Sequence, residues 1–167
     1  MNERFAPGRD YDELQPGESF STPGRTITEA DLVSFSALTG DRHPLHADAE
    51  WAGRSRFGGR VAHGMMLLSY AVGLAPFDPG RVLALRKIDA VSFRRPVHIG
   101  DTVHLEGEVE QLQEVDDEMG MVTFAWRVVN QRGETAVRAR VTALWRRGER
   151  LDVPSRAGLP EPEEVLL

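Results

Sequence analysis

The sequence predicts one α+β domain in which an antiparallel sheet packs on a single apolar helix. Two observations carry this prediction. Patterns with helical spacing fall between residues 28 and 75, and patterns with strand alternation follow from Val82 onward. A chain of 167 residues, of which 41% are hydrophobic, is the size of one domain and can bury a real core.

Two helices are predicted in the first half of the chain. The first runs from Thr28, which can cap it, to Thr39, and Gly40 ends it. Leucine and phenylalanine recur inside it at helical spacing. The second runs from Gly64 to Ala75 and stops before Pro76. It is apolar nearly all round, so we expect it to be buried on most of its sides.

The connection between these helices is predicted to consist of loops and one short helical turn. The segment GDRHPLH, residues 40–46, is expected to be a loop, and a helical turn follows around residues 48–53. The glycine-rich segment RFGGRVAHG, residues 56–64, then forms a turn. These loops hold most of the histidines.

From Val82 onward the pattern is that of strands. Apolar Val103, Leu105 and Val109 alternate with polar residues, which predicts a strand with one face toward water. Two further strands are expected at residues 121–130 and 135–145, joined by the turn QRGE, and the segment DDEMG forms the hairpin turn before them.

The two ends of the chain are expected to be irregular or frayed. Residues 1 to about 15 are polar, and the tail from Gly148 is rich in proline and glutamate. A single domain, residues 1–167, is therefore predicted to have its core at about residues 16–147. The N-terminus has no apolar leader, and no apolar run approaches the ~20 residues that cross a bilayer, so we expect a cytoplasmic protein without membrane contact.

Composition excludes several classes of function. The formal net charge is −6 and the basic residues are scattered, which does not fit a nucleic-acid partner. The chain has no cysteine, which excludes disulfides, thiolate metal sites and a cysteine nucleophile.

Histidine and carboxylate side chains gather in the segment SALTGDRHPLHAD, residues 36–48. Asp41 and His46 are five residues apart, and Pro44 stiffens the loop between them, so both groups can converge on one ligand as an acid–base pair. Seventeen residues later, His63 and Gly64 open the apolar helix, where free backbone N–H groups can stabilise a thioester oxygen that gains negative charge.

The segments TGDRHPLHAD, RFGGRVAHGMMLLS and SFRRPVHIGDTV, in this order and spacing, resemble the (R)-specific enoyl-CoA hydratases of the MaoC family. The resemblance covers about Ser21 to Trp145. The family signature is similar to G-D-x-N-P-x-H, and this chain has His43 where asparagine is usual. The resemblance implies a hot-dog fold, a homodimer or higher homo-oligomer, and an acyl-CoA or acyl-carrier-protein thioester as substrate.

The resemblance also implies roles for named residues. Asp41 and His46 would be the catalytic pair that interconverts 2-enoyl and 3-hydroxyacyl thioesters, with no metal or other cofactor; which residue moves which proton stays open. The Gly64 N–H would form the oxyanion hole. Ser69, His63 and His43 are the candidate substrate-binding residues.

Other interpretations remain open at this point. The same fold carries thioesterases, although residues 64–75 contain no carboxylate, and it also serves as a non-catalytic acyl-binding subunit. Asp41 can be a simple turn residue, and His63 a residue that orients the loop. Asp41, His43, His46 and Asp48 also suit a metal site. His98 and His104 are expected at the surface. Arginines 54, 56, 60, 86, 94 and 95 can bind CoA phosphates or be exposed to solvent.

Overall fold

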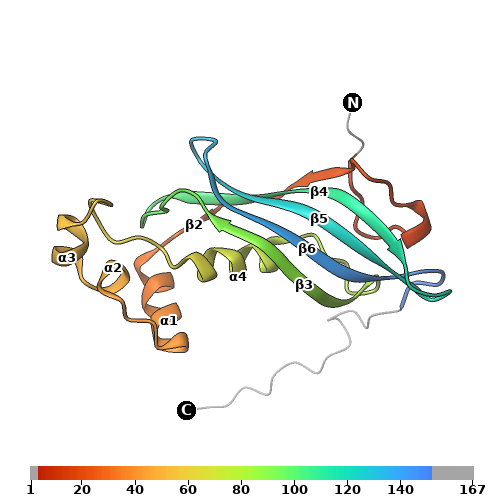
Figure 1. Ribbon diagram of the computed structural model, residues 1–167, viewed down its shortest axis with the longest axis horizontal. Coiled ribbons are helices and arrows are strands. Elements are labelled where there is room, and N and C mark those ends of the chain that lie inside the picture. Colours follow the sequence, from red (N-terminus) through yellow and green to blue (C-terminus); the bar gives the residue numbers. More distant parts are fainter. Residues whose placement is uncertain (1–3, 152–167) are drawn as a thin grey trace, which may run out of the picture.

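The computed structural model describes residues 4–151 and contains one antiparallel sheet of six strands. The strand order is β1-β4-β5-β6-β3, with β2 also paired to β4 (Figure 1). This confirms the predicted fold class. The elements are η1 (Tyr11–Glu13), β1 (Ser19–Ser21), β2 (Arg25–Thr26), α1 (Glu29–Thr39), α2 (Pro44–Ala47), α3 (Ala49–Arg54), α4 (Gly64–Leu74), β3 (Val82–Phe93), β4 (Thr102–Glu114), β5 (Met119–Asn130) and β6 (Thr135–Arg146).

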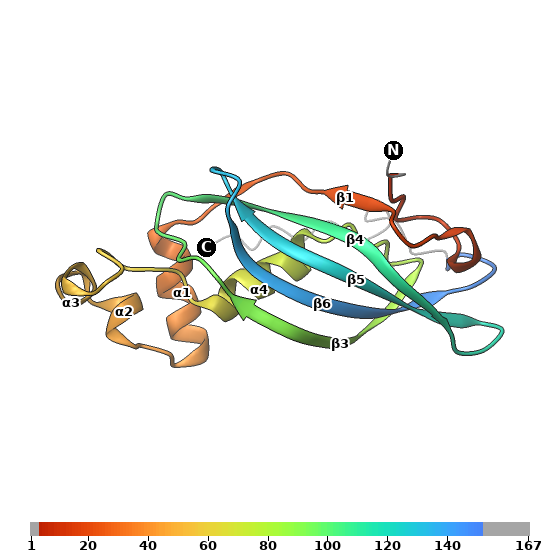
Figure 2. The same cartoon turned by 45° about the horizontal axis from the view of Figure 1, so that its top comes forward.

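The sheet curves around α4, which lies in its hollow (Figures 1 and 2). One side of α4 is buried through Met66, Leu67, Leu68 and Ala71, and the sheet contributes alternate apolar residues to the same core. The other side of α4 is open, with Met65 56% exposed. The helix is therefore not buried on most sides within one chain, which differs from the prediction.

The strands after α4 follow the predicted alternation. In β4 the side chains of Val103, Leu105 and Val109 are buried, and Leu105 lies opposite Val128 of β5. In β5 and β6 the same period places one face on the core and the other outward.

The N-terminal segment was expected to be irregular or frayed; apart from η1, residues 5–15 are irregular, but the expectation that they fray is wrong. Phe5, Tyr11 and Leu14 are buried in the core cluster. The Tyr11 ring occupies the space that a side chain would fill at Gly120, where an added Cβ would lie 2.2 Å from the ring. Three apolar residues set in a polar segment give no periodic pattern, so the sequence did not reveal this packing. The predicted tail lies mostly outside the described residues.

Helices α1, α2 and α3 and their connections, residues 29–63, form a helical lobe at the end of the sheet where α4 begins (Figure 2). The segment GDRHPLH was expected to be a loop, but Pro44 starts the short helix α2 within it. Proline suits this first helical position because its missing N–H needs no partner there. Within residues 4–151, no helix has both the length and the apolar character that a bilayer crossing requires.

Candidate active site

Asp41 follows directly on the end of α1. The helix begins at the predicted cap Thr28, which forms a capping box with Asp31, and Gly40 ends it in the left-handed conformation at φ 75°. The reversal lets the Asp41 N–H donate to Thr39 Oγ1 at 3.2 Å, and Asp41 Oδ1 accepts the His43 N–H at 3.2 Å. These local bonds hold the exposed carboxylate directly after the end of α1.

His43 is the N-cap residue of α2. Its ring Nδ1 accepts the Leu45 N–H at 3.1 Å, which is the bond that an asparagine side chain makes at an N-cap. The imidazole at this position therefore supplies the capping interaction that an asparagine could make. The ring also packs edge-on against Trp51, with centroids 5.5 Å apart.

His46 lies in the last turn of α2, and its ring is held by the main chain. Nδ1 is 2.7 Å from the carbonyl oxygen of Val61. Because a carbonyl only accepts, Nδ1 carries the hydrogen and donates it, which leaves Nε2 of the neutral ring with its lone pair available. The ring is half-buried, so Nε2 can act on a bound ligand.

His63 lies directly beneath His46. It is 2% exposed, and the two rings stack with centroids 3.8 Å apart. Its Nε2 is 3.2 Å from the Asp41 carbonyl oxygen and 3.2 Å from Ser36 Oγ, so Nε2 carries the hydrogen. Burial lowers the pKa of His63 and outweighs the opposing effect of its bond to the Asp41 backbone. The ring is therefore neutral at neutral pH and supports both members of the pair.

The structure brings together Asp41, His46 and His63, whose side-chain ligand atoms all lie within 4.8 Å of one another. His63 is also the residue that precedes α4, so the group lies beside the amino end of that helix. The metal set considered from the sequence does not assemble among residues 4–151. Of its other two members, His43 caps α2 and Asp48 Oδ1 accepts the Trp51 N–H at the start of α3.

Gly64 is the first residue of α4, and its environment explains why it has no side chain. An added Cβ would lie 2.6 Å from the Phe93 ring. Within residues 4–151 no hydrogen bond to the Gly64 N–H is present, and the first helical bond runs from Leu67 N–H to the His63 carbonyl. Ser69 lies on the exposed side of the helix, where its Oγ donates to the Met65 carbonyl at 2.8 Å.

Three contributors to this site were not singled out from the sequence. Ser36 contacts His63 Nε2, the Val61 carbonyl holds His46, and Phe93 lies over Gly64. Ser36 has a weak signal, because it lies in the last turn of a helix that leads into Asp41. A backbone carbonyl such as that of Val61 has no signal in a sequence, and Phe93 lies almost 30 residues from Gly64.

Residues 13–132 match the family model described as MaoC like domain. The chain is 35% identical over 109 residues to the (R)-specific enoyl-CoA hydratase of Aeromonas caviae, covering 65% of this chain and 78% of that protein. It is 44% identical over 106 residues to Protein MaoC of Klebsiella aerogenes, covering 62% of this chain but only 31% of that protein's length.

Solved structures show the same relationship. The R-hydratase PhaJ1 from Pseudomonas aeruginosa matches with a TM-score of 0.69 at 33% identity, over 92% of this chain and 94% of that one. A Mycobacterium tuberculosis protein described as a double hot-dog fold matches with a TM-score of 0.77 at 19% identity, over 92% of this chain and 49% of that one. The second likeness concerns the fold alone, and it confirms the hot-dog architecture. Since the family model spans well over half of the sequence, the chain belongs to the MaoC-like domain family.

Proposed function

We propose that this protein interconverts 2-enoyl and 3-hydroxyacyl thioesters by adding or removing water, with Asp41 and His46 as the catalytic pair. The observation that carries the proposal is their convergence beside the amino end of α4, with His46 Nε2 left available by the bond from Nδ1 to Val61. Relatives named as an (R)-specific enoyl-CoA hydratase and a 3-hydroxybutyryl-CoA dehydratase support this reaction class.

The proposed chemistry needs a base, a proton carrier and an oxyanion site. Water binds between the Asp41 carboxylate and His46 Nε2, and its oxygen attacks C3 while one of its protons passes to the pair. One proton is then delivered to C2, so the atoms balance without a cofactor. The thioester oxygen gains negative charge on the way, and the Gly64 N–H at the positive end of α4 stabilises it.

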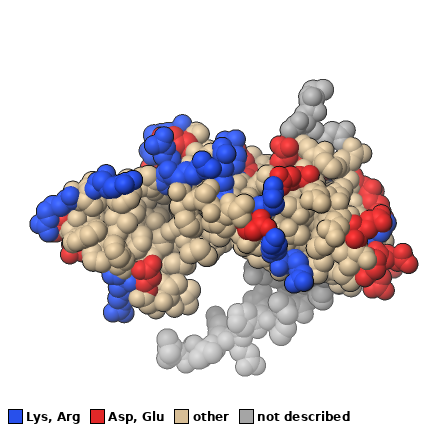
Figure 3. Space-filling view, viewed as in Figure 1, with Lys and Arg blue, Asp and Glu red and all other residues tan. Residues whose placement is uncertain are grey.

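Charge on the surface supports an anionic carrier for the acyl group. Lysine and arginine side chains lie along the edge of the molecule near α3 and near the β5–β6 turn, whereas acidic side chains gather at the other end (Figure 3). Arg42, Arg54 and Arg56 are exposed and belong to the helical lobe that holds Asp41 and His46. We propose that phosphate groups of coenzyme A or of a carrier-protein pantetheine arm bind on this side.

We propose further that the protein acts as a homodimer or a higher homo-oligomer through β3. This strand lies at the edge of the sheet, and its apolar residues Leu85, Val91 and Phe93 are exposed. A second copy of the chain would cover them in a two-fold contact. Light scattering after size exclusion should give at least twice the chain mass, and Val91→Lys should lower it; a wild-type monomer at micromolar concentration would contradict this part.

Hydration of crotonyl-CoA tests the function directly. The wild-type protein should remove the absorbance of the conjugated enoyl thioester, and Asp41→Asn and His46→Gln should each lower kcat by about 10²-fold or more. His104→Gln, a surface change on β4 beside Glu106, serves as the matched control and should keep full activity. Full activity in either Asp41→Asn or His46→Gln on any good enoyl substrate would refute the assignment.

The same assay separates the alternatives. A thioesterase would release free thiol from acyl-CoA, and a non-catalytic subunit would bind acyl-CoA and leave the enoyl absorbance unchanged. The thioesterase is not favoured, because α4 presents no carboxylate to the site.

A further inference from the structure

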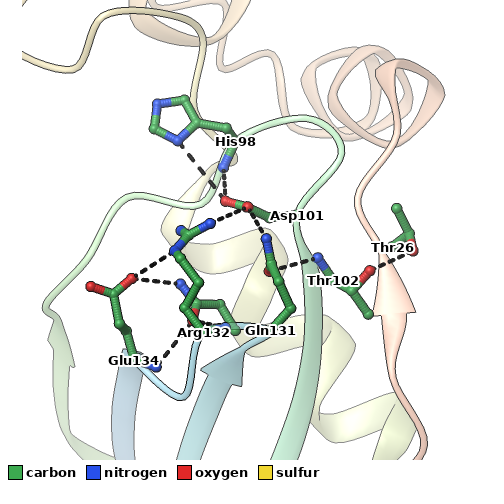
Figure 4. Close-up of polar contacts among 8 residues, drawn as sticks. Thr26, His98, Asp101, Thr102, Gln131, Arg132 and Glu134 are labelled. Atoms are coloured by element: carbon green, nitrogen blue, oxygen red, sulfur yellow. Dashed lines mark hydrogen bonds and ion pairs between the residues drawn. The ribbon is translucent and has the colours of Figure 1, made fainter.

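A buried carboxylate, Asp101, lies just before β4 at the end of the sheet next to the helical lobe. Its side chain is 9% exposed and accepts three hydrogen bonds. They come from the His98 N–H at 2.9 Å, Gln131 Nε2 at 2.5 Å and Arg132 Nη1 at 3.0 Å (Figure 4). Burial raises the pKa of Asp101, but these bonds outweigh burial and lower it, so the group is a carboxylate at neutral pH. Asp101 thereby fastens the turn at residues 98–101 to the β5–β6 turn.

The turn held by Asp101 supports the segment that anchors His46. The Ala62 N–H donates to the Val97 carbonyl at 2.7 Å, and Val61 forms an antiparallel bridge with His98. The Val61 carbonyl, on this same short segment, accepts the hydrogen bond from His46 Nδ1. The His46 ring is therefore connected to Asp101 through two steps of backbone pairing.

The His98 side chain adds a second connection to the helical lobe. Its Nε2 is 3.1 Å from the Phe57 carbonyl and donates to it. Phe57 lies in the turn that leads to Val61, so both ends of this turn depend on the position of His98. His98 was expected at the surface, and here it has a structural role.

The backbone of Asp101 also holds the start of α1. The Ile27 N–H donates to the Asp101 carbonyl at 2.8 Å, and the Gly100 N–H donates to the Ile27 carbonyl at 2.8 Å. Ile27 is fully buried and precedes the cap of α1, whose far end carries Asp41. A capped helix of 11 residues is stiff, so a shift at Ile27 moves Asp41.

We propose that Asp101 is a positioning residue that sets the geometry between Asp41 and His46, through Ile27 on one side and through His98 and Val61 on the other. The proposal rests on the proposed hydratase function, because it gives Asp101 an effect on that catalytic pair. A misplacement of about 1 Å in a catalytic group costs on the order of 10²-fold in rate, so loss of this anchor should lower kcat and leave thioester binding nearly unchanged.

The experiment compares three variants of the full chain, assayed well below their melting temperatures. Asp101→Asn keeps the shape of the side chain but replaces one carboxylate oxygen by an NH₂ group. That group cannot accept the hydrogen bonds that the carboxylate oxygen accepts. Arg132→Gln removes one partner of Asp101 and the contact of Arg132 with Glu134. Glu134→Gln is the matched control, because it disturbs Arg132 and Asn130 but has no contact with Asp101. We expect kcat to fall at least tenfold in Asp101→Asn and severalfold in Arg132→Gln, with KM within threefold of wild type and with Glu134→Gln unchanged.

Nitrogen NMR of the imidazole rings gives a readout that does not depend on activity. In wild type His46 should be the Nδ1–H tautomer, and Asp101→Asn should shift its ring signals while Glu134→Gln leaves them in place. If the wild type lacks hydratase activity but these shifts occur, the function fails and the positioning stands. If folded Asp101→Asn keeps kcat within twofold, or if the His46 signals do not move, the positioning is refuted. If Asp101→Asn does not fold, Arg132→Gln decides by the same two criteria.

Discussion

His63 should make the protein lose stability when the pH falls below about 6.5, the ordinary pKa of histidine. Burial lowers its pKa in the folded state, so between the two pKa values the unfolded chain binds a proton that the folded chain does not. The free energy of unfolding therefore has its full value above the pKa that His63 has in the unfolded chain, and it declines as the pH falls below that value. Binding of one proton changes the free energy of unfolding by at most about 1.4 kcal/mol per pH unit. For a chain of this size, each kcal/mol changes Tm by roughly 2–4 °C.

Among the described groups whose pKa the fold shifts, His63 is the one whose ordinary pKa lies near 6.5. The carboxylates with lowered pKa values, such as Asp31 and Asp101, have ordinary values of 3.8 and contribute their stability changes below that pH. Around His63 itself, His46 and Asp41 are the charged neighbours, and their effects on its pKa have opposite signs. Hence the slope between pH 6.5 and 5 should come mainly from the buried imidazole.

The assay is thermal unfolding followed by circular dichroism at half-unit steps between pH 5 and 7.5. The test variant is His63→Gln, whose amide can still donate to the Asp41 carbonyl but does not titrate. Its melting temperature at pH 7.5 should be lower than that of wild type, and its decline below pH 6.5 should be clearly shallower. His104→Gln should keep the wild-type slope. An unchanged slope in His63→Gln would show that the folded state tolerates a charged His63 and would refute the burial argument.

Three further predictions follow from particular contacts. His43→Asn should keep stability and activity because it preserves the N-cap bond to Leu45. His43→Ala should lower the free energy of unfolding, measured by chemical denaturation, by about 1 kcal/mol. An equal loss of stability in both variants would contradict the capping role. Gly120→Ala should destabilise the protein by about 1–3 kcal/mol, since its Cβ would lie 2.2 Å from the Tyr11 ring. Added to Tyr11→Ala, the same Gly120→Ala change should cost much less than it costs in wild type, because the ring it meets is gone. Prolonged treatment with EDTA should leave hydratase activity unchanged, because the proposed proton transfers balance with Asp41, His46 and water alone. Activity that falls and returns with added divalent metal would instead show that Asp41, His46 and His63 hold a metal ion.

Local signals in the sequence were sufficient for most of the fold. Thr28 and Gly40 mark the ends of α1 within one residue, and the alternation around Val103 and Leu105 gives β4 its correct inward face. Packing that joins distant segments was not predictable in this way. The packing of the Tyr11 ring on Gly120 joins two residues more than 100 positions apart. The hydrogen bond from His46 to Val61 depends on a backbone oxygen that every residue type possesses.

The candidate site shows why side-chain spacing alone was not enough. Asp41 and His46 were predicted as a pair from Pro44 and the five-residue separation, but their relative placement depends on His63, which stacks on one ring and bonds to the backbone of the other residue. The two imidazoles also carry their hydrogens on different nitrogens, because the Val61 carbonyl faces Nδ1 of His46 and the Asp41 carbonyl faces Nε2 of His63. The two carbonyls leave Nε2 of the half-buried His46 ring for chemistry, whereas the remaining nitrogen of His63, Nδ1, is buried, which gives that ring a supporting role. A substitution that moves either carbonyl should therefore impair catalysis even if every side chain of the pair is retained.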